Sequence, residues 1–179
     1  MKQSFAVWIT GLPASGKSTV RTRLVEELAS RGVEAAVLES DVLREVLGAE
    51  GYDEAGRDRF YRSMVWIGDL LTRHGVPVIF DATANRRRYR DLARRQIPAF
   101  LEVYVDTPLE VCVRRDPKGI YRRGRGDPAG TVPGLQAVYE PPLEPEVRIA
   151  GGETEPRQAA LEIIGRLAEM GLLPQPPGR

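Results

Sequence analysis

One stretch near the N-terminus of this 179-residue chain restricts its fold more than any other: residues 11–18 read GLPASGKS. They fit the pattern G-x-x-x-x-G-K-[ST] at every position. An apolar run over 5–9 precedes the stretch, and Val20, Leu24 and Leu28 follow it at helical spacing. Such an order of strand, glycine-rich loop and helix is typical of a loop whose backbone N–H groups surround a polyphosphate at the helix N-terminus.

The motif predicts the roles of its polar residues. Lys17 is expected to contact the β- and γ-phosphates and to be catalytic, and the Ser18 hydroxyl is expected to ligate Mg²⁺. ATP and Mg²⁺ are therefore the expected cofactors. The alternative is a glycine-rich turn without a ligand, which would require the whole match to be a coincidence. The other nucleotide-binding residues predicted from this loop are Gly11, Ala14, Ser15, Gly16 and Thr19.

Length and composition indicate one soluble domain over 1–173 and a frayed tail over 174–179. The chain has 42% hydrophobic residues, but no apolar run is long enough to span a bilayer and no signal peptide is recognisable. We therefore expect a cytoplasmic protein without membrane contact. Cys112 is the single cysteine and His74 the single histidine, which argues against a disulfide and a zinc site. Cys112 is predicted to be a buried inert thiol, and His74 to end a helix without a catalytic role.

The rest of the chain alternates strands and helices. Strands are predicted over 34–38, 76–80, 100–105 and 146–149. The predicted helices are a short one capped by Ser40 or Asp41, a long one after a loop over 48–56, one over 87–96, one from Pro108 to 116–117, and one carrying Leu161, Ile164 and Leu167. Repeated strand–helix units predict a three-layer α/β P-loop NTPase fold, with a parallel sheet covered by helices on both faces.

Residues 117–145 are rich in Gly, Pro and Arg and show no periodicity. A long irregular stretch inside a compact domain is usually functional, so we expect a lid over about 115–145.

The net charge of +1 conceals two basic clusters. The first arginine cluster comprises Arg86, Arg87, Arg88, Arg90, Arg94 and Arg95, and the second basic cluster comprises Arg114, Arg115, Lys118, Arg122, Arg123 and Arg125. A polyanionic ligand would account for both clusters. Ordinary solvated faces are the alternative.

Acidic residues follow two of the predicted strands, where an α/β sheet places its ligands. Phosphoryl transfer needs a metal ion that bridges phosphate oxygens and a group that orients the attacking hydroxyl. Asp41 is the predicted base or orienting carboxylate, with a helix cap as the alternative. Asp81 resembles the acidic residue that ends a Walker B strand and holds Mg²⁺ or its water, with a turn-forming aspartate as the alternative. Which of the two is the base is left open.

Several segments together resemble adenylylsulfate kinase. They are Gly11–Thr19, Asp41 with Arg44, Val103–Cys112, Arg115–Tyr121 (RDPKGIY), Tyr139–Pro142 (YEPP) and Pro145–Val147. The resemblance implies a sheet of the nucleoside-monophosphate-kinase type with a lid, and transfer of the γ-phosphoryl group of ATP to the 3′-hydroxyl of adenylylsulfate. It also implies that Asp41 is the catalytic carboxylate. Arg44 and Arg57 would contact the anionic substrate, and Arg115 and Lys118 would lie near the ATP purine and phosphates, with Lys118 also at the substrate.

The departures from the family pattern gather on the acceptor side. Glu39–Val42 reads ESDV where the family usually has DGDN, and an expected asparagine falls at about Phe60. The two phenylalanines that enclose the acceptor adenine fall at about Tyr52, which retains a ring that stacks, and Val132, which does not. Asp81–Asn85 replaces the family's FISP segment, so Thr83 is the candidate for its serine.

Three functions are compatible with these features. The first is a kinase for adenylylsulfate or another small anionic hydroxyl compound, and the second is a kinase for polynucleotide 5′-hydroxyl ends, which the basic clusters favour. The sequence shows no interleaved aromatic platform for single strands, which disfavours a nucleic-acid partner. The third is a non-catalytic nucleotide-binding regulator, disfavoured because a lid with several arginines suits phosphoryl transfer. A homodimer is left open.

Overall fold

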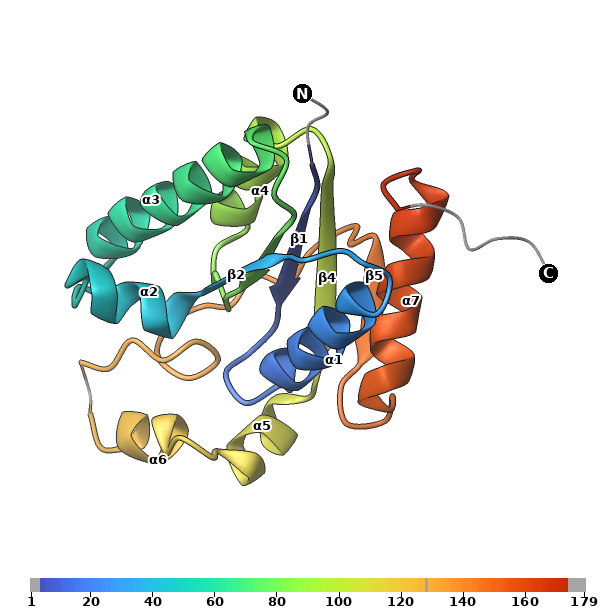
Figure 1. The fold of residues 1–179 in the computed structure, drawn as a ribbon. Coiled ribbons are helices and arrows are strands. Elements are labelled where there is room, and N and C mark those ends of the chain that lie inside the picture. The colour runs from blue at the N-terminus through green and yellow to red at the C-terminus, as the bar shows by residue number, and fades with distance from the viewer. Residues whose placement is uncertain (1–3, 128, 174–179) are drawn as a thin grey trace.

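The computed structural model of the protein describes residues 4–127 and 129–173. Its centre is a sheet of five parallel strands in the order β2-β3-β1-β4-β5 (Figure 1). The strands are β1 (Ala6–Thr10), β2 (Ala36–Glu39), β3 (Val78–Asp81), β4 (Phe100–Asp106) and β5 (Val147–Ala150). The predicted parallel α/β sheet is confirmed. The predicted tail over 174–179 lies outside the described residues.

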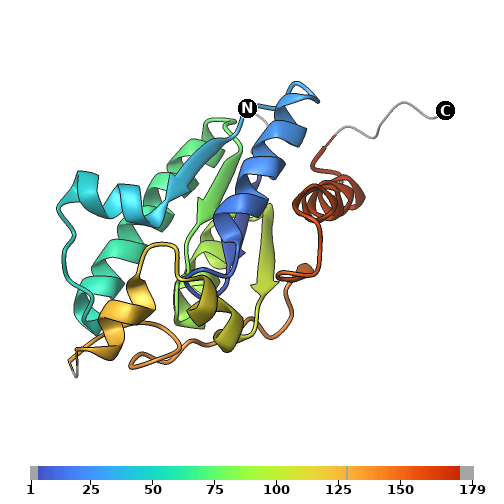
Figure 2. The same ribbon diagram turned by 90° about the horizontal axis from the view of Figure 1, so that it is seen from below.

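Helices cover both faces of this sheet, as Figures 1 and 2 show. They are α1 (Lys17–Ala29), α2 (Ser40–Leu47), α3 (Glu54–Arg73), α4 (Arg87–Gln96), α5 (Leu109–Arg115), α6 (Ile120–Arg125) and α7 (Pro156–Glu169). α1 and α7 pack on one face, and α3 and α4 on the other. No helix in the described part of the chain has the length and apolar character that crossing a bilayer requires.

The alternation of side chains along β1 explains the two separate cores. Val7 and Ile9 point to the face covered by α1 and α7, whereas Ala6 and Trp8 point to the face covered by α3 and α4. Trp8 is fully buried and stacks on Phe80 of β3 with ring centroids 4.5 Å apart. Both faces of β1 are therefore packed, which fixes the loop that follows it.

Some element boundaries differ from the expectation. α3 begins at Glu54, because the Asp53 carboxylate caps it by accepting from the Gly56 N–H at 2.9 Å, so the predicted loop over 48–56 is shorter. The helix expected from Pro108 begins one residue later, with Pro108 as its N-cap. In α7, Ile163, Ile164 and Leu167 are buried, while Leu161 is only half-buried. The stretch over 117–145 was expected to be irregular, but it contains α6.

Candidate active site

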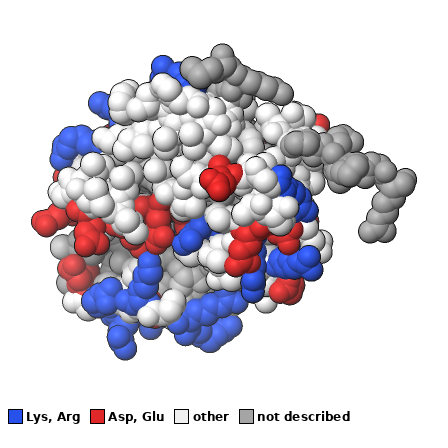
Figure 3. All heavy atoms as spheres, in the orientation of Figure 1, with Lys and Arg blue, Asp and Glu red and all other residues white. Residues whose placement is uncertain are grey.

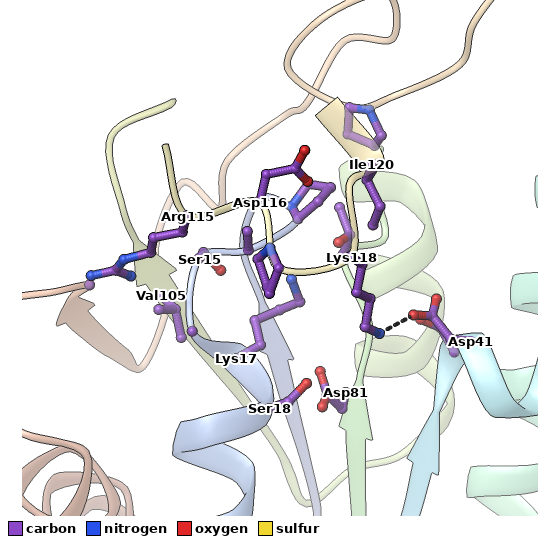
Figure 4. Close-up of a pocket in the computed structure, with 18 of the residues that line it drawn as sticks. Ser15, Lys17, Ser18, Asp41, Asp81, Val105, Arg115, Asp116, Lys118 and Ile120 are labelled. Carbon is purple, nitrogen blue, oxygen red and sulfur yellow. Dashed lines mark hydrogen bonds and ion pairs between the residues drawn. The ribbon is translucent and has the colours of Figure 1, made fainter. Parts of the chain in front are cut away.

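The carboxyl ends of the strands open into one cleft of about 1050 Å³ (Figure 4). It is walled by the phosphate-binding loop, the starts of α1 and α2, the loop after β3 and the segment that follows α5. The predicted site residues that line it are Ala14, Ser15, Gly16, Lys17, Ser18, Thr19, Asp41, Arg44, Tyr52, Arg57, Asp81, Thr83, Arg115 and Lys118. The structure thus brings together residues that lie far apart in the sequence.

Gly11 does not line the cleft, but the loop requires it. A Cβ atom there would lie 2.6 Å from the Val105 carbonyl oxygen and 2.7 Å from the Ser15 hydroxyl oxygen. Ala14 adopts a left-handed backbone with a φ of 61°, which is unusual for a residue with a side chain. Such strain is typical of ligand-binding loops, whose surroundings hold them in an unfavourable conformation.

Two polar side chains of the loop are arranged for a phosphate. Lys17 Nζ donates to the carbonyl oxygens of Gly11 at 3.1 Å and Leu12 at 2.8 Å, so the ammonium group lies over the loop. Burial lowers the pKa of Lys17, while the nearby Asp81 carboxylate acts in the opposite direction. Ser15 Oγ is buried and has no hydrogen-bond partner among the described residues. A water molecule or a ligand can satisfy a buried polar atom of this kind.

Asp81 ends β3 and is only 3% exposed. Figure 4 shows its carboxylate beside the Ser18 hydroxyl. Among the described residues its hydrogen bond is with Arg21 Nε at 3.4 Å, and not with a backbone N–H of a turn. The described residues contain no group of three or more His, Cys, Asp or Glu side chains suited to a metal ion. A Mg²⁺ ion takes most of its ligands from substrate phosphates and water, so one hydroxyl and one carboxylate fit it.

Asp41 lies in the first turn of α2 and does not cap the helix. β2 runs directly into α2, so Glu39, with a φ of −90° and a ψ of 124°, is the N-cap and the expected cap at Ser40 or Asp41 is wrong. The Asp41 carboxylate instead accepts from Lys118 Nζ at 2.7 Å across the cleft (Figure 4). This hydrogen bond raises the pKa of Lys118. Both side chains are 58% exposed, so the pair is accessible to a ligand.

Two arginines, Arg44 of α2 and Arg57 of α3, also line the cleft, and we call them the arginine wall. Arg44 is 7% and Arg57 is 8% exposed, yet neither has a carboxylate partner among the described residues. Arg57 Nη2 donates to the Thr131 carbonyl oxygen at 2.6 Å, and burial lowers the pKa of Arg57. Buried charges normally have a counterion. This end of the cleft is therefore suited to an anionic ligand.

The predicted residues Arg115, Tyr52 and Thr83 occupy different parts of the cleft. Arg115 lies against Gly152, where a Cβ atom would be 2.5 Å from Arg115 Nη2, and it points away from Lys118 (Figure 4). Tyr52 is at the arginine wall and is 49% exposed. The Thr83 carbonyl oxygen accepts from Thr10 Oγ1 at 2.6 Å, while its side chain is half-buried. Arg115 and the arginine wall thus line the cleft from different elements, Arg115 from α5 and the wall from α2 and α3.

The first arginine cluster does not form a binding surface for an anion. The interpretation that it binds a polyanionic ligand is therefore wrong. Most of its guanidinium groups are engaged in ion pairs. The pairs are Arg86–Glu140 at 3.1 Å, Arg88–Asp58 at 2.5 Å, Arg90–Glu102 at 2.7 Å and Arg94–Glu146 at 2.5 Å. Pairs with Glu140 and Glu146 attach the segment before β5 to α4. The cluster is structural.

The second basic cluster remains available to a ligand in part. Arg115, Lys118 and Arg123 line the cleft. Figure 3 shows Lys and Arg gathered along the lower edge of this face, where α5 and α6 lie in Figure 1. Their position beside the phosphate-binding loop is consistent with a polyanionic ligand.

Sequence reasoning missed other residues at the site. Arg21 bridges Glu39 at 3.1 Å and Asp81 at 3.4 Å, and its spacing of four from Lys17 on one helix could have indicated this. Asn85 is 4% exposed and its Nδ2 donates to the Val138 carbonyl oxygen at 2.9 Å. Ala84, next to it, has a left-handed φ of 42°, for which the sequence carries no signal.

Comparisons with known proteins agree with this geometry. The family described as adenylylsulphate kinase matches residues 3–150. The chain is 36% identical to a probable adenylyl-sulfate kinase of Pyrococcus abyssi over 96% of this chain and 99% of that protein. It is 40% identical to an adenylyl-sulfate kinase of Synechococcus sp. over 82% and 84% of the two chains.

A solved structure is similar as well. It is the adenylylsulfate kinase of Mycobacterium tuberculosis in complex with AMPPNP and APS, with a TM-score of 0.87 and 34% identity over 94% of this chain and 99% of that one. Fold, cleft and sequence thus lead to one assignment: the chain belongs to the adenylylsulphate kinase family and is an ATP-dependent P-loop kinase.

Proposed function

We propose that this kinase transfers the γ-phosphoryl group of ATP to the 3′-hydroxyl of adenylylsulfate. The observation that carries the proposal is one cleft lined by a phosphate-binding loop, the Asp41 carboxylate and two buried arginines that have no carboxylate partner among the described residues. The similar structure from Mycobacterium tuberculosis, solved in complex with AMPPNP and APS, supports binding of both a nucleotide and adenylylsulfate.

The ATP side would be held by the loop before α1. Its backbone N–H groups and the positive end of the helix attract phosphate oxygens, and Lys17 adds a full charge. The Ser15 hydroxyl, which has no partner in the described part of the chain, would donate to the same phosphates. Arg115 would also contact the nucleotide, together with Ala14, Gly16 and Thr19.

Ser18 and Asp81 would hold Mg²⁺. When bound, the ion would neutralise charge on the phosphate oxygens. Arg21 fixes Asp81 through its hydrogen bond at 3.4 Å and also contacts Glu39, so the carboxylate is oriented before any ligand binds. A preorganised carboxylate loses little freedom on binding.

Asp41 would accept the proton of the attacking hydroxyl. The hydroxyl oxygen forms a bond to the γ-phosphorus, the bond to the oxygen that bridges the β- and γ-phosphates breaks, and the proton moves to the Asp41 carboxylate. The same carboxylate accepts from Lys118 Nζ at 2.7 Å. Lys118 would turn to the phosphates once they arrive, because they offer it more negative charge.

The lid over 115–145 would close on both ligands. Its final part would stay in place, because hydrogen bonds attach it to the loop after β3 and to the start of α4. The Asn85 carbonyl oxygen accepts from the Glu140 N–H at 2.7 Å, and the Glu140 carboxylate accepts from the Arg87 N–H at 2.9 Å. Motion would therefore be concentrated before residue 138, around α6 and its glycines. Exclusion of water by closure strengthens electrostatic contacts in the site.

A polynucleotide 5′-hydroxyl is the weaker alternative, because the arginines that favoured it are engaged in ion pairs within the fold. The test is a coupled ADP-release assay with adenylylsulfate, adenosine 5′-phosphate and a 5′-hydroxyl oligonucleotide as acceptors. We expect turnover with adenylylsulfate. Faster turnover with the oligonucleotide would contradict the proposal.

A further inference from the structure

We propose that Tyr52 and Phe60 are positioning residues for the acceptor, because their rings hold the Arg44 guanidinium at the acceptor end of the cleft. The inference deepens the proposed function and rests on its anionic acceptor. We call the arrangement of Tyr52, Phe60 and Tyr61 around this guanidinium the Arg44 cage.

The cage is defined by short distances between the guanidinium and the rings. Arg44 Cζ lies 3.9 Å from the ring centroid of Phe60, 4.4 Å from that of Tyr52 and 5.9 Å from that of Tyr61. A guanidinium over an aromatic face within about 6 Å is attracted by the ring, and more strongly where water is excluded. Arg44 is 7% and Phe60 is 2% exposed, so the contact between them is largely free of water.

Arg44 also fixes the loop between α2 and α3. Its Nη1 donates to the carbonyl oxygens of Ala49 at 3.0 Å and Gly51 at 3.2 Å. The loop carries Tyr52, so one guanidinium holds both a ring and two backbone carbonyl oxygens of the loop that follows its own helix. The carbonyls and rings meet its hydrogen-bonding needs in part, but they supply no negative charge.

The missing negative charge is the reason to assign the cage to acceptor binding. No carboxylate oxygen among the described residues lies within 4.0 Å of Arg44, and the same holds for Arg57 on the neighbouring wall. Aromatic faces therefore stabilise a buried cation whose counterion the acceptor would provide. The rings act through Arg44 and are positioning residues.

The experiment compares Phe60→Leu, Tyr52→Leu and Arg44→Lys with Trp66→Leu as a matched control. Trp66 lies on α3 as Phe60 does, but it is 58% exposed and outside the cleft. We expect the KM for adenylylsulfate to rise about 10-fold in Phe60→Leu and about 3-fold in Tyr52→Leu. The KM for ATP and the affinity for AMPPNP should stay within about 2-fold, because the cage is built from α2, α3 and the loop between them and has no hydrogen bond or ion pair with the phosphate-binding loop among the described residues. Trp66→Leu should leave both unchanged.

A double variant tests whether the rings act through Arg44. In the Arg44→Lys background, Phe60→Leu should add less than about 2-fold to the KM for adenylylsulfate, since a lysine cannot stack or donate to two carbonyls as a guanidinium does. An equal rise in both KM values, or full additivity of the two substitutions, would overturn the inference.

An NMR measurement on the ligand-free protein separates this inference from the proposed function. The Arg44 Nε–Hε signal, identified by its loss in Arg44→Lys, should shift when either ring is removed, because ring currents act on it. If the signal has the same chemical shift in both Leu variants as in the unmodified protein, the rings do not hold the Arg44 guanidinium and the inference is wrong. If the unmodified protein does not turn over adenylylsulfate, the proposed function is wrong, and so is the role of the Arg44 cage in binding the acceptor. The NMR signal would still show whether the rings hold the Arg44 guanidinium.

Discussion

Replacing Arg90 by methionine is expected to cost about 3–5 kcal/mol of unfolding free energy, the range for breaking a buried ion pair at one partner. Arg90 is 1% exposed, and its Nε donates to Glu102 Oε1 at 2.7 Å. The substitution would leave the Glu102 carboxylate, itself 7% exposed as a residue, with Arg94 at 3.3 Å as its remaining cation. In a chain of this size the loss corresponds to a fall in Tm of about 6–20 °C.

Urea unfolding followed by tryptophan fluorescence would measure this loss, since Trp8 is fully buried and reports on the core. Arg88→Met is the matched control on the same helix. The Arg88 side chain is 49% exposed and pairs with Glu54 and Asp58, so its loss should cost less than about 1 kcal/mol.

The double variant Arg90→Met/Glu102→Leu separates stability from function. It should be more stable than Arg90→Met alone, because the buried Glu102 carboxylate is gone, although the carbonyl oxygens that accept from Arg90 still lack their donor. It should not regain activity, since Arg90 also donates to the carbonyl oxygens of Ala84 at 2.5 Å and Glu140 at 2.6 Å and so positions the loop after β3. We expect the kcat/KM of the double variant to stay about 10²-fold below that of the unmodified protein, because a small misplacement of the loop has an effect of this size. A loss below about 1 kcal/mol in Arg90→Met, or a double variant no more stable than the single one, would refute this reasoning.

The other predictions concern the cleft. Lys17→Ala should lower kcat by about 10²-fold or more with an unchanged circular dichroism spectrum, and near-normal turnover would show that the loop is not the ATP site. Asp41→Asn should lower kcat by about 10²- to 10⁴-fold with AMPPNP affinity nearly unchanged, whereas Asp81→Asn should mainly raise the Mg²⁺ concentration needed for half-maximal rate. Identical Mg²⁺ titrations of the two variants would contradict these roles. Hydrogen exchange over 115–137 should slow only with AMPPNP and adenylylsulfate together, and equal protection in all states would argue against a lid.

The nucleotide half of the site was predictable because its determinants are local. The pattern over 11–18 fixes a loop between a strand and a helix, and the helix dipole and backbone N–H groups need no distant partner. Asp41 and Asp81 were predictable for a different reason. Parallel strands end at one edge of the sheet, so residues just after β2 and β3 meet there whatever the rest of the chain does.

The acceptor half was less predictable because it depends on contacts between distant segments. Charge patterning showed the first arginine cluster, but its partners Glu102, Glu140 and Glu146 follow it at separations that no periodicity reveals. The sequence does not show that β2 enters α2 without a loop, so it cannot distinguish a helix cap from a first-turn residue at Asp41. The Arg44 cage likewise depends on a turn that places Tyr52 against α3.

If Asp41 activates the 3′-hydroxyl of adenylylsulfate for attack on the γ-phosphorus of ATP, the position of the new phosphate in the product will show it. The protein would be incubated with ATP, Mg²⁺ and adenylylsulfate, and the product examined by ³¹P NMR with coupling to the ribose protons. We expect a new phosphomonoester coupled to the 3′ proton, formed at least about 10²-fold more slowly by Asp41→Asn. A phosphomonoester at another position, or equal rates for Asp41→Asn and the unmodified protein, would contradict this expectation.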